Sequence, residues 1–253
     1  MLVTQRFTRV IAYDRAGFGW SDPGPEPRDA LQNVRELHSA LAKAGIPVPY
    51  VLVGHSYGGA VARVFTAEYP DEVVGIVLVD PRHPDQDTRF PPEAQAKSQS
   101  EAEMIATLRV LARFGVLHLT DEGKEHDLPA RQNAEYNAFH DTTQYWDSLA
   151  AQGAAITATD AQTRSAGSLG NRPLVVLSAD TAWWTPGAPA DETRRVLTEL
   201  NREQAALSSN SVHRLIAGTS HTSLVNKREH AQATIDAIRQ VVEAVRTGQP
   251  LAL

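Results

Sequence analysis

Residues 50–60 read Tyr50-Val51-Leu52-Val53-Gly54-His55-Ser56-Tyr57-Gly58-Gly59-Ala60. The apolar run Tyr50–Val53 predicts a short buried strand, and the apolar residues that follow the Gly-x-Ser-x-Gly motif recur at helical spacing. A serine held in a sharp turn between strand and helix is a nucleophile elbow, because the turn exposes its hydroxyl. We expect Gly54 and Gly58 to be needed where side chains would collide as the strand and the helix cross. The free N–H groups at the helix start would face negative charge developing beside Ser56.

The composition limits the class of protein. With 253 residues, the chain can form one large domain or a core domain with an insertion. It has 24 basic and 30 acidic residues, a net charge of −6, which argues against a nucleic-acid partner. It has no cysteine, and thus neither disulfides nor a cysteine metal site. It also lacks a long apolar run and a secretory leader, so we expect no membrane partner and a cytoplasmic location.

Apolar runs and helical patterns alternate along much of the chain. Further strands are predicted at four runs: Thr8–Tyr13, Val73–Val79, Pro173–Ser178 and Val212–Ala217. A helix is predicted to begin at Asp29, with Gln32 as capping-box partner, and to end at Gly45. This alternation predicts an α/β fold, in which a mostly parallel sheet has helices on both faces.

Residues 82–171 have a different pattern, in which helical periodicity replaces strand-like runs. We interpret this segment as an inserted helical cap, and residues 1–81 and 172–253 as the core. Three tryptophans, Trp146, Trp183 and Trp184, suggest an apolar pocket, although core packing explains them equally well.

On these features the chain resembles the α/β-hydrolase fold, in its cap-bearing esterase, perhydrolase and epoxide-hydrolase group. The segments that carry the resemblance are the glycine-rich loop Asp14–Asp22, the elbow Gly54–Gly59, the strand ends Val77–Asp80 and Pro173–Asp180, and the pair Ser220-His221. The resemblance covers residues 8–245 and implies a serine, an acid and a histidine in that chain order.

Ser56 and His221 are the predicted nucleophile and base. A serine hydroxyl needs an adjacent base, and His221 follows the last predicted strand at the same sheet edge as Ser56. His55 is adjacent to Ser56, but in an elbow its side chain should point away from it. His83 and His213 have no comparable placement.

The acid of the triad has two main candidates. Asp80 ends one strand directly and is favoured, while Asp180 follows the strand that more usually supplies the acid in the family. The usual aspartate lies slightly further along, however, where this chain has Ala182. Asp85 is a third candidate, and Asp14 is interpreted as a turn residue.

The oxyanion site is predicted to be incomplete. The Tyr57 N–H is the expected first donor, but the resemblance implies a second donor on a His-Gly loop, and the chain has no His-Gly dipeptide. We also expect the front strands that carry this loop to be missing. We therefore expect weak turnover and uncovered strand edges that invite self-association, unless residues 10–13 pair directly with residues 51–53.

The sequence thus predicts a serine hydrolase that cleaves a small or medium neutral ester, lactone or related acyl compound through an acyl-enzyme. The alternative is a weakly active or non-catalytic remnant of the fold that binds a small ligand or partner. An epoxide hydrolase or haloalkane dehalogenase is disfavoured because those enzymes have an aspartate at the position of Ser56. No cofactor or metal is implied.

Overall fold

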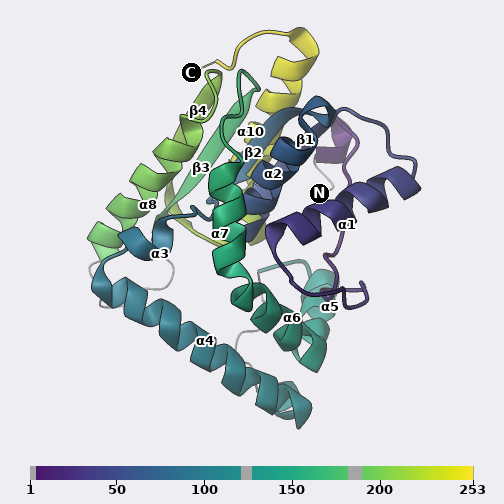
Figure 1. Ribbon diagram of the computed structural model, residues 1–253, viewed down its shortest axis with the longest axis vertical. Helices are drawn as coiled ribbons and strands as arrows, with labels where there is room; N and C mark the ends of the chain where they lie inside the picture. Colours follow the sequence, from purple (N-terminus) through teal and green to yellow (C-terminus); the bar gives the residue numbers. More distant parts are fainter. Residues whose placement is uncertain (1–3, 121–126, 182–189, 253) are drawn as a thin grey trace.

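The structure, a computed structural model, describes residues 4–120, 127–181 and 190–252. Four strands form one parallel sheet in the order β1 (Tyr50–His55), β2 (Val73–Val79), β3 (Leu174–Thr181) and β4 (Ser211–Ser220). The α-helices are α1 (Ala30–Lys43), α2 (Tyr57–Glu68), α3 (Gln86–Arg89), α4 (Pro92–Arg113), α5 (Ala130–His140), α6 (Thr143–Ala154), α7 (Ile156–Ser165), α8 (Ala190–Ala205), α9 (Ser223–Asn226) and α10 (Arg228–Thr247). Three 3-10 helices are η1 (Thr4–Arg6), η2 (Pro70–Glu72) and η3 (Val116–Leu119). The described part of the chain therefore has the α/β architecture that the alternating pattern predicts (Figure 1).

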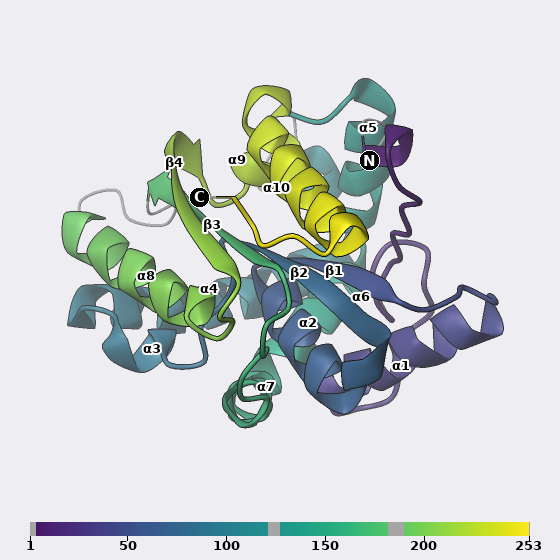
Figure 2. The same cartoon turned by 90° about the horizontal axis from the view of Figure 1, so that it is seen from above.

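The central strand β2 is apolar on both faces because helices cover both. Ile76 and Leu78 pack with α1 and α2 on one face, whereas Val77 and Val79 pack with α10 on the other. Successive side chains of a strand point to opposite faces, so one continuous apolar run serves two cores. Figure 2 shows α10 on one side of the sheet and α1 and α2 on the other.

The helix α1 has the start and stop signals expected from the sequence. The Asp29 carboxylate accepts a hydrogen bond from the Gln32 backbone N–H at 2.8 Å, while the Gln32 side chain bonds to Glu36 instead of returning to the cap. Gly45, just beyond the helix, has a left-handed φ of 63°. The capping box is thus only half formed.

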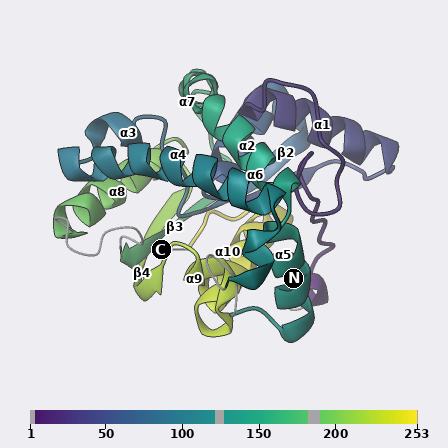
Figure 3. The ribbon, with the colours of Figure 1, turned by 90° about the horizontal axis from the view of Figure 1, so that it is seen from below.

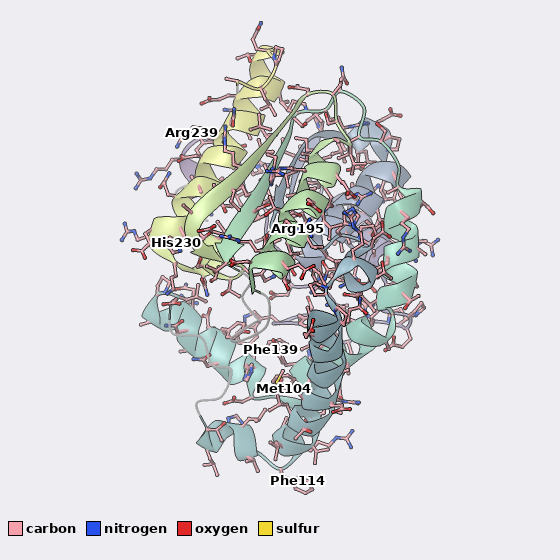
Figure 4. The ribbon with its side chains drawn as sticks, turned by 90° about the vertical axis from the view of Figure 1, so that its left-hand side faces the viewer. Met104, Phe114, Phe139, Arg195, His230 and Arg239 are labelled. Atoms are coloured by element: carbon pink, nitrogen blue, oxygen red, sulfur yellow. The ribbon has the colours of Figure 1, made fainter. Side chains whose placement is uncertain are left out.

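Helices α3 to α7 make up the part of the sequence that connects β2 to β3. The helices α4 and α6 pack on each other around Trp146, whereas α7 packs on α1 and α2. Figure 3 shows α4 crossing the molecule beside α6, and Figure 4 shows Met104, Phe114 and Phe139 in this helical part, away from the sheet. Trp146 is a core residue of this packing, and Trp183 and Trp184 lie outside the described residues.

The prediction of a strand at Thr8–Tyr13 is wrong. This segment has no strand conformation, and Ile11 and Tyr13 are 46% and 41% exposed. A groove of about 890 Å³ separates it from β1, so the two backbones do not form the ladder considered for residues 10–13 and 51–53. Apolar composition alone does not make a strand, because the backbone groups also need a partner. Among the described residues β1 is therefore an edge strand.

Candidate active site

The elbow places Ser56 between β1 and α2 with a strained backbone. Ser56 has φ 54° and ψ −123°, a conformation rare for a residue with a side chain. Its backbone N–H donates to Val79 O at 3.2 Å, and its carbonyl accepts from Gly59 N and Arg82 N. These bonds fix the turn against the end of β2 and leave the serine side chain at the sheet edge.

Gly54 and Gly59 permit the close approach of the strand and the helix, whereas the sequence predicted Gly54 and Gly58 for this role. A Cβ on Gly54 would lie 2.3 Å from Gly58 O, and a Cβ on Gly59 would lie 2.5 Å from the Pro81 side chain. A Cβ on Gly58 would meet nothing within 4 Å, so the expectation that Gly58 avoids a collision is wrong. The backbone of Gly58 lies against the strand at Gly54, whereas its own Cβ position faces open space.

Three strand ends bring Ser56, Asp80 and His221 to one edge of the sheet. Ser56 follows β1 directly, Asp80 follows β2, and His221 follows β4. All strands are parallel, so their carboxyl ends lie together. The three residues line one cavity of about 540 Å³.

Asp80 contacts the histidine directly. Its Oδ2 lies 2.7 Å from His221 Nδ1, and its Oδ1 accepts hydrogen bonds from the Ala179 backbone N–H at 3.1 Å and from Asn201 Nδ2 at 3.4 Å. Asp80 is buried and has a left-handed φ of 41°. Both carboxylate oxygens are thus held, and the Nδ1 side of the imidazole is directed at a fixed acceptor.

The other candidate acids bond elsewhere. Asp180 pairs with Arg194 at 3.3 Å and accepts the Gly218 backbone N–H at 3.1 Å. Asp85 pairs with Arg164 at 2.6 Å, and Asp14 accepts the Trp20 N–H inside its own loop. The geometry therefore brings Asp80, and none of these three, to His221.

His55 has a contact that sequence reasoning missed. Its Nε2 donates to the His221 carbonyl oxygen at 2.9 Å, and the two rings lie 4.4 Å apart. Burial, followed by the proximity of His221, lowers the pKa of His55 to about 4, so the ring is neutral at pH 7. His55 supports the loop of His221 rather than Ser56. Nothing in the sequence signals this contact between residues so far apart.

A buried polar network behind Asp80 was also missed. Asn201 Nδ2 donates to Ser178 Oγ at 2.8 Å as well as to Asp80, and Ser178 Oγ lies 2.8 Å from His213 Nε2. Ser178 and Asn201 are almost fully buried. The only sequence signal is the presence of polar residues within apolar periodic patterns, namely Ser178 in β3 and Asn201 in α8.

The two arginines that line the cavity form ion pairs with neighbouring carboxylates. Arg82 pairs with Asp160 and Asp87, and Arg109 pairs with Asp147 at 2.7 Å. Burial alone would lower the pKa of Arg82, but its hydrogen bonds to the two carboxylates outweigh this and raise it. The remaining wall is largely apolar, with Ile105 and Leu149 contributed by α4 and α6. Such a cavity favours an uncharged ligand.

The first residue of α2 offers a backbone donor beside the serine. Tyr57 is buried, and its hydroxyl group donates to Arg28 O and accepts from Asn33 Nδ2, both at 3.2 Å. These bonds hold the residue in place. The first N–H groups of a helix have no partner within the helix, so the Tyr57 N–H is a candidate donor for the cavity that Tyr57 lines.

The described residues give no sign of a metal centre or a membrane span. Within residues 4–120, 127–181 and 190–252, no group of three or more histidine, aspartate or glutamate side chains is arranged to hold a metal ion. In the same part of the chain, no helix is both long and apolar enough to cross a membrane.

Comparison with known proteins identifies a family. The sequence model described as "Alpha/beta hydrolase family" matches residues 2–237. An uncharacterized protein of Bacillus subtilis, YqjL, is 36% identical over 97 residues, which are 38% of this chain and 38% of that protein. The bovine (lyso)-N-acylphosphatidylethanolamine lipase is 33% identical over 117 residues, 41% of this chain and 34% of that protein. The chain thus spans well under two thirds of the length of these curated relatives.

Solved structures share the fold. An esterase from Thermogutta terrifontis has a TM-score of 0.60 at 20% identity, covering 92% of this chain and 78% of that chain. A structure from a study of carboxylesterases of Nitrososphaera gargenis has a TM-score of 0.62 at 17% identity, covering 98% of this chain and 84% of that chain. At these identities the likeness establishes the architecture alone.

Proposed function

The chain belongs to the alpha/beta hydrolase family, and on that premise we propose that it is a serine hydrolase acting on a small or medium uncharged ester, lactone or related acyl compound. One observation carries the proposal: the 2.7 Å contact of Asp80 with His221, in the cavity that Ser56 also lines. A serine, a histidine and a buried carboxylate in this relation are the parts of a hydrolytic triad.

Each residue has a defined step. Ser56 Oγ attacks the acyl carbon while His221 Nε2 takes its proton, and the C=O electrons move onto the oxygen. The Tyr57 N–H donates to that oxyanion. When the oxyanion collapses, the bond to the leaving alkoxide breaks and His221 returns the proton to it. Water then attacks the acyl-enzyme by the same route, with Asp80 holding the imidazole throughout.

The cavity and the relatives support an uncharged acyl substrate. The arginines at the wall are already bonded to carboxylates, and apolar side chains of α4 and α6 line the rest. The esterase among the similar structures and the lipase among the curated relatives are named for ester cleavage. We also interpret residues 82–171 as a cap over this cavity, because α4 and α6 supply part of its wall.

Covalent labelling and substitution of Ser56 test the proposal. A fluorophosphonate probe should label the wild-type chain at Ser56 and leave Ser56→Ala unlabelled. Hydrolysis of short p-nitrophenyl esters should likewise be lost in Ser56→Ala while its thermal unfolding midpoint stays near that of the wild type. A wild-type chain that is neither labelled nor active would favour the alternative, a non-catalytic binding protein. Full turnover by Ser56→Ala would exclude Ser56 as the nucleophile.

A further inference from the structure

A glutamine near the end of α6, Gln152, lines the cavity and bonds to Arg15. Gln152 Oε1 accepts a hydrogen bond from Arg15 Nη1 at 2.6 Å. A guanidinium group can only donate, so the oxygen of the Gln152 amide must face Arg15 and its NH₂ group must face away. This bond therefore settles the orientation of the amide, which distances alone would leave ambiguous.

Arg15 is a fixed anchor beside Tyr57. Its guanidinium lies 4.7 Å from the centre of the Tyr57 ring and 4.8 Å from that of Phe18. It forms no ion pair with a carboxylate in the part of the chain that the structure describes. Two aromatic faces and one amide oxygen hold the cation, so Gln152 is tied to the residue whose N–H is the first oxyanion donor.

Gln152 lines the same cavity as Ser56, Tyr57 and His221. Its Nε2 has no hydrogen-bond partner within residues 4–120, 127–181 and 190–252, and it is not among the buried polar atoms that lack one. We propose that Gln152 Nε2 donates the second hydrogen bond to the acyl oxygen of the substrate, in concert with the Tyr57 N–H. This inference rests on the proposed function, and it assigns the donor for which the sequence offers no candidate.

The other polar groups of the cavity are less suited to this role. Gln86 also lines it, with its amide oxygen accepting the His83 N–H at 3.2 Å. Gln86 begins α3, which follows the strand that ends at Asp80. In the described part of the chain, no hydrogen bond links Gln86 to Tyr57 or to Arg15. Arg82 and Arg109 are bonded to carboxylates. Gln152 is the lining residue whose donor is both oriented and tied to the first donor.

Replacement of Gln152 by glutamate or methionine tests the proposal. Glu can still accept from Arg15 but has no donor, and Met has nearly the same size without polar hydrogens. Loss of one oxyanion donor lowers turnover by about a hundredfold or more, and we expect kcat to fall on this scale in both variants while KM changes little. A boronic acid, whose adduct with serine places an oxygen at the same position, should bind more weakly by a similar factor.

A fluorophosphonate probe separates failure of this inference from failure of the proposed function. Labelling of Ser56 should still reach full stoichiometry in both variants, only more slowly. If the wild type is labelled and active while the variants keep its kcat and boronate affinity, Gln152 is not the donor. If the wild type is never labelled, the proposed function itself fails. A fall in kcat for Gln152→Glu alone would indicate charge repulsion and overturn the assignment.

Two further variants sharpen the result. Gln86→Glu makes the same change in the same cavity, and its effect on kcat should be smaller than that of Gln152→Glu. Arg15→Met releases the amide without removing it, so it should lower kcat partly, and the double variant with Gln152→Met should be no worse than Gln152→Met alone. A larger effect at Gln86, or additive losses in the double variant, would contradict the proposal.

Discussion

At the residue scale, two aspartates compete for one role, and the structure gives them different partners. Asp80 contacts His221 Nδ1 at 2.7 Å, while Asp180 is bonded to Arg194 and Gly218 N. We expect Asp80→Asn to lower kcat by roughly ten-thousandfold, because an amide would favour the wrong imidazole tautomer. Asp180→Asn should lower it much less. Steady-state kinetics on a p-nitrophenyl ester decide between them, and the reverse ranking would transfer the role to Asp180.

His55 predicts a pH dependence of stability. Its pKa is about 4 in the folded chain, chiefly because of burial, against roughly 6.5 when unfolded. Between these values the unfolded chain binds more protons, so stability falls as the pH drops from about 6.5 to about 4, by up to about 3 kcal/mol. Urea unfolding between pH 7 and pH 4 should therefore show a smaller decline for His55→Gln than for the wild type. The pKa of His83 is also lowered, but His83 is present in both chains, so its contribution cancels in the comparison. Equal losses of stability in the wild type and His55→Gln would contradict the prediction.

At this scale, the sequence allows prediction of residues that follow predicted strands, but not of the residues whose side chains contact and support them. Ser56, Asp80 and His221 could be named because each comes at or within a few residues of the end of a predicted strand, and parallel strands end at one edge. His55 and Gln152 contact His221 O and Arg15, which lie far away along the chain. A motif contains no information on such partners.

At the element scale, the junction of β1 and α2 depends on Gly54. A Cβ at this position would lie 2.3 Å from Gly58 O and 2.7 Å from Gly59 N, both backbone atoms that cannot move independently. Gly54→Ala should therefore cost about 3 kcal/mol or more of unfolding free energy and lower the labelling of Ser56. Denaturant titration measures this loss.

Gly58→Ala is the matched control, because a Cβ there meets nothing within 4 Å and Gly58 lies inside α2. Alanine restricts the unfolded chain more than glycine, so this variant should be as stable as the wild type or more stable by about 0.5–1 kcal/mol. Equal losses in both variants would mean that the crossing of strand and helix is not what requires Gly54.

The strands and helices themselves were predicted with one clear failure, at Thr8–Tyr13. The apolar runs at 73–79, 173–178 and 212–217 became β2, β3 and β4, because each finds parallel neighbours and helices on both faces. Residues 8–13 also contain several apolar residues but pair with no strand in the described part of the chain, since the groove beside β1 intervenes. Composition indicates which segments can form strands, and pairing decides which of them do.

At the scale of the whole molecule, the fold leaves β1 uncovered on its outer edge. β1 pairs with β2 alone in the described residues, and Val53 is 48% exposed on it. An open edge with apolar side chains is a template for pairing with another strand, and a second copy of the chain presents the same edge. We therefore predict that the protein self-associates through β1 as its concentration rises.

Sedimentation velocity at increasing protein concentration tests this prediction. Wild-type chains should shift toward a dimer, and Val53→Lys should stay monomeric because two edges in contact would bring like charges together without water. Val48→Lys is the matched control, since Val48 is 53% exposed but precedes β1, and it should associate like the wild type. Labelling of Ser56 should be the same in all three chains, because the cavity lies at the ends of the strands rather than along the edge. A wild-type chain that remains monomeric throughout would show that the β1 edge is protected in solution, and equal association of all three chains would move the contact elsewhere.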